Sequence, residues 1–410
     1  MIQKEIIRSL FNLSHFISEN VTFREQSMFC FDMEAHQDEL KRGIEGKSVC
    51  VIGGAGSIGS SFIKALLPYH PASLTVVDYN ENGLAELVRD IRSSKNMYVP
   101  EQFCLYPIDY SSGVFKKILS DRKGFDIVAN FSAHKHVRSE KDHYSIEALI
   151  RNNLLNANEL LELLSIYPPE EYFCVSTDKA ANPVNIMGAS KRIMEDLAFC
   201  YSDRFAVKTA RFANVAFSNG SLLDGFLVRI SKGQPLSGPM DVRRFFVSPE
   251  ESGQICLMAC ILADNREILF PKLDESQMMS FDTIGRRLLE EFGYQAEECS
   301  SDEEAIELAE NLRKGSRMYP VRFSASDTSG EKSYEEFYTD KETLDLSRFS
   351  SLGVIVGKMK PNQKRIGTLL KELENVFSGT YSKMDVLKIL EGYLPDFHHV
   401  ETGKNLDGKM

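Results

Sequence analysis

Short apolar runs alternate with amphipathic stretches through the first half of the chain, beginning near residue 48. Five runs predict buried strands, because they are short, apolar and bounded by polar residues or glycine: SVCVIGG, SLTVVDY, FCLYPIDY, DIVANFSA and YFCVSTD. Stretches between them, notably 57–69, 82–94 and 145–165, have apolar positions at helical spacing. Strands that alternate with helices of this length predict βαβ units. The pattern therefore indicates an α/β protein with a doubly wound parallel sheet.

The segments outside this alternation predict further parts of the chain. Residues 2–18 and 32–45 have helical spacing before the first strand, and the alternation loosens after about residue 210. We predict a helical N-terminal extension, a sheet domain, a smaller α/β domain that binds substrate and a C-terminal extension, with bounds 1–45, 46–210, 211–345 and 346–410.

The composition and net charge of the chain exclude some classes of binding partner and location. The net charge of −11 over 410 residues argues against general nucleic-acid binding, which needs clustered Lys and Arg. The eight cysteines include no CxxC pair, and we predict no metal site. No run approaches the roughly 18 apolar residues that span a bilayer, and charged residues interrupt the N-terminus, unlike a signal peptide. We therefore expect a cytoplasmic protein without membrane insertion.

A glycine-rich turn follows the first predicted strand and opens the next helix. Its residues form a predicted phosphate cradle: Gly53, Gly56, Ser57, Ile58 and Gly59. The glycines permit close approach of the backbone to a pyrophosphate, which the helix N-terminus then binds. Asp78 ends the second strand 19 positions past the last glycine, where a carboxylate binds ribose hydroxyls and repels a 2′-phosphate. We therefore predict a Rossmann-like domain that binds NAD rather than NADP, with Asp109 at a third strand end as an adenine contact.

A second polar cluster follows the fifth predicted strand. The run VSTDK, residues 175–179, puts a hydroxyl, a carboxylate and an amine at a strand end, where open α/β sheets bind ligands. Met187 and Lys191 follow at i and i+4, on one face of the next predicted helix. These groups suit acid–base chemistry, except that a thioether cannot act as a base.

The chain resembles the extended short-chain dehydrogenase/reductase superfamily, and within it the polysaccharide-biosynthesis group of UDP-N-acetylglucosamine 4,6-dehydratases. The resemblance rests on these motifs: GGAGSIGS, SAHKHV, RNNLLNANELLE, VSTDKAANPVNIMGASKR, RFANVAFSNGS, RRFF and GEKSYEEF. Most of the superfamily has Tyr where this chain has Met187. A branch similar to the configuration-retaining dehydratases also carries Met there, so the resemblance implies an active enzyme of that branch.

The resemblance implies a role for each residue of the cluster. Lys179 would be the base at C5 of the sugar, Asp178 the acid for the departing 6-hydroxyl and Thr177 a partner of O4. Lys191 would bind the nicotinamide ribose and lower nearby pKa values through its charge. The O4 proton would go to a bound water or to Asp178.

The resemblance also implies contacts with the sugar nucleotide. The expected substrate-binding residues are Lys135, His136, Asn153, Arg211, Asn214, Ser218, Asn219 and Arg244. Three positions depart from the family pattern: Arg138 replaces Pro, Ala213 replaces Gly and Thr328 replaces Arg. These departures bear on the nucleotide and sugar contacts and leave the predicted NAD turn and the VSTDK run unchanged.

Three functions stay open at this point. The first is dehydration of a UDP-sugar for a surface glycan. The second is a UDP-sugar epimerase, which needs no acid–base pair at C5 and C6, and the third is a non-catalytic NAD- or sugar-nucleotide-binding protein. The apolar helices predicted over 145–165 and 187–201 are expected to pair between subunits in a homodimer.

Overall fold

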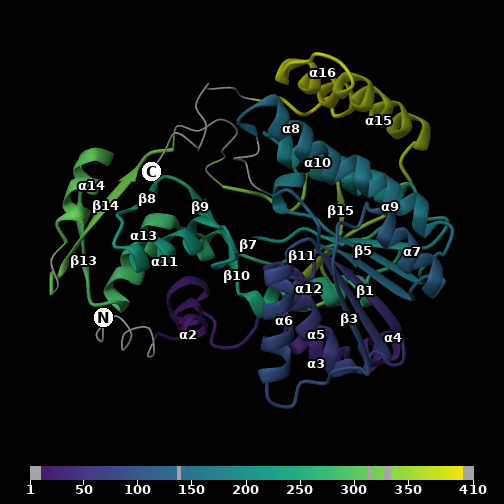
Figure 1. Cartoon of the computed structure of the whole chain (residues 1–410), viewed down its shortest axis with the longest axis horizontal. Helices are drawn as coiled ribbons and strands as arrows, with labels where there is room; N and C mark the ends of the chain where they lie inside the picture. Colours follow the sequence, from purple (N-terminus) through teal and green to yellow (C-terminus); the bar gives the residue numbers. More distant parts are fainter. Residues whose placement is uncertain (1–10, 136–139, 313–314, 327–331, 333, 400–410) are drawn as a thin grey trace.

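A nine-stranded sheet forms the larger of two lobes in the computed structural model (Figure 1). The structure describes residues 11–135, 140–312, 315–326, 332 and 334–399. The strand order is β15-β16-β11-β6-β5-β4-β1-β2-β3. In chain order these strands are β1 Ser48–Ile52, β2 Ser73–Asp78, β3 Gln102–Pro107, β4 Ile127–Asn130, β5 Glu171–Val175, β6 Ala206–Ala210, β11 Ile268–Pro271, β15 Thr343–Asp345 and β16 Leu352–Val356. The predicted α/β class with a doubly wound sheet is confirmed.

Neighbouring strands from β3 to β11 in this order are parallel. At the other edge, β16 pairs antiparallel with both β11 and β15. Strands β2 and β4 are buried along their whole length, as expected where helices cover both faces of a sheet. The chain leaves β1 toward β2 and later returns on its other side with β4. This reversal opens a crevice at the carboxyl ends of β1 and β4, the position at which such sheets bind ligands.

Helices cover both faces of the sheet (Figure 1). One face carries α3 Cys30–Ala35, α4 Gln37–Ile44, α5 Ser57–Leu66, α6 Glu81–Ser93 and α12 Pro249–Leu262. The other carries α7 Gly113–Arg122, α8 His143–Ile150, α9 Asn156–Leu164 and α10 Ile186–Phe199. None of the helices in the described ranges has the length and hydropathy that a membrane crossing requires.

Two C-terminal helices, α15 Gln363–Phe377 and α16 Lys383–Tyr393, lie outside α8 and α10 (Figure 1). The Tyr381 hydroxyl bonds the Glu147 carboxylate on α8, and the Tyr393 hydroxyl lies 3.4 Å from Asp196 on α10. The Arg151 guanidinium stacks 5.3 Å from the Phe377 ring centre. This helical pair therefore adds a further layer over one face of the sheet.

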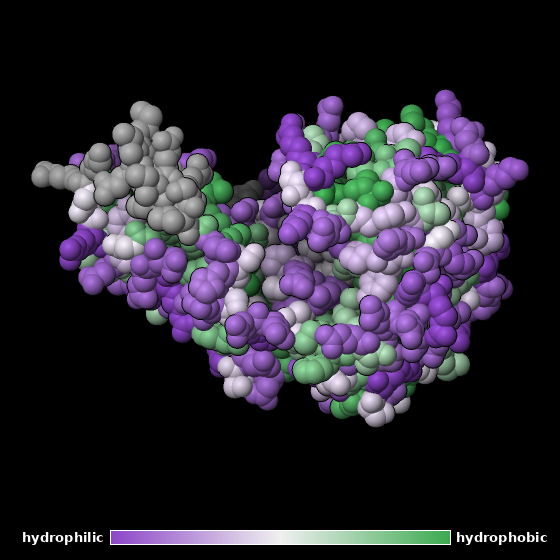
Figure 2. Space-filling model, turned by 90° about the horizontal axis from the view of Figure 1, so that it is seen from below, coloured by the Kyte–Doolittle hydropathy of each residue, from purple (hydrophilic) through white to green (hydrophobic). Residues whose placement is uncertain are grey.

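The smaller lobe has its own core around a three-stranded parallel sheet, and Figure 2 shows a hollow between it and the larger lobe. Its main elements are β8 Leu236–Pro239, β13 Gln295–Glu298, β14 Met318–Ser324, α11 Leu222–Lys232, α13 Phe281–Glu291 and α14 Asp302–Glu310. Short strand pairs lie beside the hollow: β7 Asn214–Val215 with β10 Phe246–Val247, and β9 Arg243–Arg244 with β12 Met279–Ser280.

The chain crosses between the lobes more often than the predicted boundaries imply. Residues 249–271 and 343–356, assigned to the substrate domain and its C-terminal neighbour, return to the larger lobe as α12, β11, β15 and β16. The N-terminal extension is divided as well. Helix α2, Leu13–Ile17, packs in the smaller core, whereas Leu40 and Ile44 pack in the larger one. Hydrophobic spacing shows that a segment is buried, but not against which core.

Candidate active site

The glycine turn between β1 and α5 is folded as a close-fitting cradle. Gly53 has φ +74°, and a Cβ there would lie 2.7 Å from the Ser132 nitrogen. A Cβ on Gly59 would lie 2.4 Å from the Gly53 oxygen. Gly56 caps α5 without a side chain, so the N–H groups of the first helical turn point toward the crevice. Ile58 packs against the larger core and fixes this helical turn. The cradle fits a diphosphate.

The two predicted ribose and adenine residues flank this cradle. Asp78 is 8% exposed, and its carboxylate accepts hydrogen bonds from the N–H groups of Ala55 (3.0 Å) and Asn80 (2.9 Å). It therefore ties β2 to the glycine turn. Asp109 is exposed after β3, and its carboxylate accepts from the N–H of Ser111 at 2.8 Å. The adenine contact of Asp109 stays a prediction.

Two side chains and one backbone N–H donate to one carboxylate oxygen at the end of β5. Asp178 Oδ1 accepts from the Thr177 hydroxyl at 2.7 Å, from the Lys179 N–H at 2.8 Å and from Lys179 Nζ at 3.1 Å. Asp178 is 2% exposed, so this hydrogen-bonded group is shielded from water. The hydroxyl, carboxylate and amine predicted from the sequence therefore do form one cluster.

Helix α10 brings Met187 and Lys191 to the same strand end. Lys191 is buried, and its Nζ donates to the Val175 oxygen at 3.0 Å, the last residue of β5. Burial lowers the pKa of Lys191 to about 8, against the attraction of Cys174 and Glu195. Met187 is 2% exposed, and its N–H donates to Glu140 at 3.0 Å.

Asn153 forms hydrogen bonds with the loop after β4. A wide (π) turn, Arg151–Leu155, joins α8 to α9, and such turns recur at functional sites. From it the Asn153 amide accepts from the His134 N–H (2.9 Å) and donates to the His134 oxygen (3.1 Å) and to Ser190 (3.0 Å). Asn153 is buried and holds the loop after β4 against α10, and its contact with a substrate stays a prediction.

Predicted cofactor and substrate residues meet at Asn219. Its N–H donates to the Ser57 hydroxyl at 2.8 Å, and its oxygen accepts from Lys135 Nζ at 3.2 Å. The surrounding protein lowers the pKa of Lys135, although the side chain keeps access to solvent. Ser218, in the same turn, is 8% exposed. Asn214 pairs β7 with β10 and is half-buried, and His136 lies outside the described residues.

Arg211 was expected to bind the diphosphate, and the structure contradicts this. Its five N–H donors are all used: Nε and Nη2 bond Glu195 at 2.8 and 2.7 Å, both Nη atoms bond Glu342 at 2.8 and 3.0 Å, and Nη1 bonds the Phe337 oxygen at 3.1 Å. The side chain is 0% exposed. Arg211 therefore joins structural elements and does not face the cleft.

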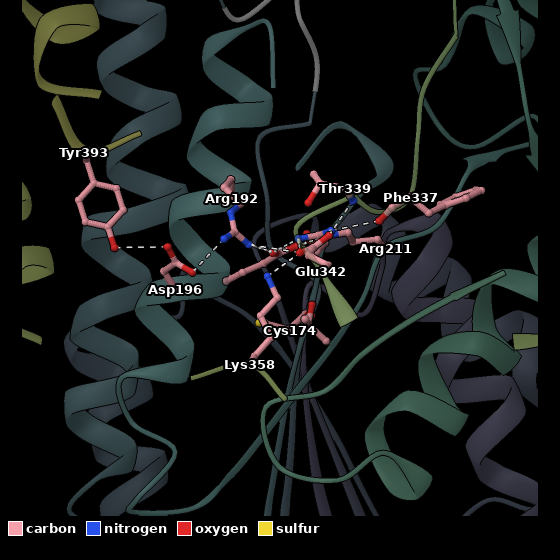
Figure 3. A network of polar contacts seen from close by, with 12 residues as sticks. Cys174, Arg192, Asp196, Arg211, Phe337, Thr339, Glu342, Lys358 and Tyr393 are labelled. Carbon is pink, nitrogen blue, oxygen red and sulfur yellow. Dashed lines mark hydrogen bonds and ion pairs between the residues drawn. The ribbon is translucent and has the colours of Figure 1, made fainter. Parts of the chain in front are cut away.

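The Arg211 ion pairs belong to a network that reaches the C-terminal helices (Figure 3). Glu342 lies between Arg211 and Lys358, whose Nζ is 2.6 Å from it. Glu195 also accepts from the Ser176 hydroxyl at 2.6 Å, directly before Thr177. Burial raises the pKa of Glu195, but the charge and hydrogen bonds of Arg211 outweigh it and hold that pKa at about 2.

A residue that was not predicted completes the cluster. Glu335 Oε1 lies 3.8 Å from Lys179 Nζ and 3.8 Å from the Arg244 guanidinium. Arg244 is 4% exposed, and its Nη1 donates to the Lys332 oxygen at 2.9 Å. The match GEKSYEEF contains Glu335 and was the signal that could have singled it out.

Comparison with known proteins identifies the group to which this chain belongs. The family model described as polysaccharide biosynthesis protein matches residues 49–344. An uncharacterized membrane protein of Methanocaldococcus jannaschii is 29% identical over 77% of this chain and 88% of its own length. An inverting UDP-N-acetylglucosamine 4,6-dehydratase of Campylobacter jejuni is 22% identical over 73% of this chain and 84% of its own.

Solved structures show the same fold. Pen from Bacillus thuringiensis superposes with a TM-score of 0.63 at 21% identity, over 78% of this chain and 90% of that one. The matched residues include the glycine turn, the Asp178–Lys179 cluster and Lys191. The chain therefore belongs to the polysaccharide biosynthesis protein family, within the extended short-chain dehydrogenase/reductase superfamily.

Proposed function

We propose that this protein catalyses the NAD-dependent 4,6-dehydration of UDP-N-acetylglucosamine to a UDP-2-acetamido-4-keto-2,6-dideoxyhexose, for a surface glycan. The observation that carries the proposal is the buried Asp178–Lys179 pair at the end of β5. Dehydration needs an acid and a base on adjacent carbons, whereas epimerisation at C4 does not. The Campylobacter relative that bears the name of this activity supports the same choice.

The NAD site of this proposal is the turn formed by Gly53, Gly56 and Gly59. A side chain at Gly53 or Gly59 would collide with the protein backbone, so only glycine permits this tight turn at the start of α5. Asp78 would bind the adenosine ribose, and Lys191 the nicotinamide ribose at the end of β5. Bound there, NAD would supply the hydride acceptor for C4 of the sugar and the hydride donor for C6, with no net oxidation or reduction of the cofactor.

One proton transfer from Lys179 to Asp178 produces both the acid and the base of the proposed reaction. In the resting ion pair Lys179 is an ammonium and Asp178 a carboxylate, joined at 3.1 Å. Moving one proton along this bond makes Lys179 a base and Asp178 an acid together. Lys179 then takes the C5 proton, the C6–O bond breaks, and Asp178 gives its proton to the departing hydroxide, which leaves as water. When C6 receives the hydride, the Lys179 ammonium returns a proton to C5. The oxidised C4 acidifies C5 and makes this elimination feasible.

The O4 proton needs an acceptor other than Met187, whose thioether is not basic. The Thr177 hydroxyl donates to Asp178 at 2.7 Å and keeps its lone pairs for another donor. It can therefore accept a hydrogen bond from O4 of the sugar. The O4 proton passes to a bound water, because Asp178 already carries the proton that it received from Lys179.

The test is incubation of the full chain with UDP-N-acetylglucosamine and NAD in heavy water. Mass spectrometry should show loss of one water, and NMR should show deuterium at C5 and report its configuration. Lys179→Met should lower the rate of dehydration at least about a hundredfold, in the range of lost acid–base catalysis. The exposed Lys117→Met on α7 is the matched control and should keep the wild-type rate. A wild-type product with unchanged mass and inverted C4 would establish the epimerase instead.

A further inference from the structure

A carboxylate on the segment that returns from the smaller lobe meets the amine of the candidate active site. Glu335 is 5% exposed and lies in the connection between β14 and β15. Its Oε1 is 3.8 Å from Lys179 Nζ, which also lies 3.1 Å from the carboxylate of its chain neighbour Asp178. Lys179 therefore lies between two carboxylates, of which only Asp178 has a role in the proposed reaction.

Lys332 and Phe337, on either side of Glu335 in the sequence, each accept a hydrogen bond from a buried arginine. Before it, the Lys332 oxygen accepts from Arg244 at 2.9 Å. After it, the Phe337 oxygen accepts from Arg211 at 3.1 Å, and the Phe337 ring is buried in the larger core. Both arginines are themselves buried. The place of the Glu335 carboxylate is therefore set by the fold, unlike that of a carboxylate on a loose surface loop.

Charged groups surround Glu335 from three elements. Lys179 follows β5, Arg244 lies on β9 at 3.8 Å, and Lys332 on its own segment is 4.0 Å from Oε2. Burial raises the pKa of Glu335 and the negative Asp178 adds to this, whereas the three cations lower it. The pKa of Glu335 is raised on balance, and the three cations within about 4 Å oppose that rise.

We propose that Glu335 is a positioning residue that directs the Lys179 amine into the cleft and holds protons on the Asp178–Lys179 pair. This inference rests on the proposed function. A negative charge 3.8 Å from Lys179 stabilises the protonated forms of the pair. Glu335 thereby sets the pH range in which the pair carries the one proton that the reaction needs. Arg244 and Lys332 act against the effect of burial and favour the charged form of this carboxylate.

The experiment compares the pH dependence of kcat/KM in wild type and Glu335→Gln. Loss of the charge should move both limbs of the profile to lower pH by about one to three units. This range is the effect of one charge at this distance, from the dielectric constant of water to that effective near a protein surface. Glu335→Asp keeps the charge and should keep the wild-type limbs. Glu336→Gln is the matched control, because Glu336 is the exposed chain neighbour and bonds Asn182 instead.

A second readout separates this inference from the proposed function. The rate at which an amine-reactive reagent labels Lys179, followed by mass spectrometry, depends on its neutral fraction and needs no turnover. Labelling at neutral pH should be roughly tenfold faster or more in Glu335→Gln, in proportion to a shift of at least about one pH unit. If Glu335→Gln does not fold, Glu335→Ser removes the same charge.

The outcomes are distinct. A wild type that does not dehydrate the sugar sinks the proposed function, and the labelling rates then still test Glu335. The positioning role is overturned if the folded Glu335→Gln or Glu335→Ser variant keeps both the pH limbs and the labelling rate of the wild type, whatever its loss in kcat. A Glu335→Asp profile displaced as far as that of Glu335→Gln also overturns it, because charge would then not be the cause.

Discussion

Replacing Glu195 with Gln tests whether a buried ion pair holds the catalytic helix against the end of β5. Glu195 lies on α10, four positions after Lys191, and is 0% exposed. Its carboxylate accepts from the Ser176 hydroxyl and from two nitrogens of Arg211. The Gln variant keeps the size of the side chain and one hydrogen-bonding oxygen, but leaves the Arg211 guanidinium with Glu342 as its only bonded carboxylate.

The size of the effect follows from the pKa of Glu195. A fall from the ordinary value of 4.5 to about 2 corresponds to about 3 kcal/mol of folding free energy, at about 1.4 kcal/mol per pH unit. Breaking a buried pair by removing one partner costs about 3–5 kcal/mol, which agrees. Because the folded pKa is depressed, this stabilisation is present above pH 4.5 and is lost as the pH falls toward 2. The difference between wild type and variant should therefore shrink to about 1 kcal/mol at pH 3.

Urea denaturation followed by circular dichroism, at pH 7 and at pH 3, measures both quantities. The control is Glu159→Gln on α9, where an exposed carboxylate lies 3.8 Å from Lys116 and should contribute under about 1 kcal/mol at either pH. A Glu195→Gln variant that loses under about 1 kcal/mol at pH 7 would refute the reasoning. So would a loss that is equally large at pH 3, because the charge would then not be its source.

Two further predictions concern the NAD cradle. Gly59→Ala should weaken NAD binding at least about tenfold, or about 1.4 kcal/mol, in a calorimetric titration. The new Cβ would lie 2.4 Å from the Gly53 oxygen, so the turn must shift and its backbone donors are misplaced. The control is Gly225→Ala, whose Cβ meets nothing within 4 Å and which should bind NAD as the wild type does. NAD affinity of the wild type should fall as the pH rises through about 8, where Lys191 loses its charge, and Lys191→Met should bind weakly at every pH. If NAD binding by Lys191→Met still changed with pH, a group other than Lys191 would be responsible for the pH dependence.

The parts of the site that could be predicted from the sequence have local signals. The glycine turn, Asp78 and the run from Thr177 to Lys179 stand directly at strand ends, and strand ends are visible as the ends of apolar runs. Lys191 follows because helical spacing places it one turn after Met187. Each of these predictions needs only the order of elements along the chain.

The parts that were missed depend on partners far apart in the sequence. Arg211 follows β6, and its direction is decided by Glu195 and by Glu342, 131 positions away. Glu335 reaches Lys179 only because the chain returns from the smaller lobe at that point. The lobe to which β11 belongs is likewise a matter of tertiary packing. Charge type and hydrophobic spacing carry none of this information.

The pair α15–α16 changes what the outer side of the sheet domain offers to other molecules. The two helical stretches expected to associate between subunits correspond to α8–α10, and the chain's own C-terminal helices lie on α8 and α10 through Tyr381, Phe377 and Tyr393. The chain thus supplies in cis the helical layer that a neighbouring subunit would bring. A homodimer built on the parts of α8 and α10 that these contacts cover would have to displace that layer first.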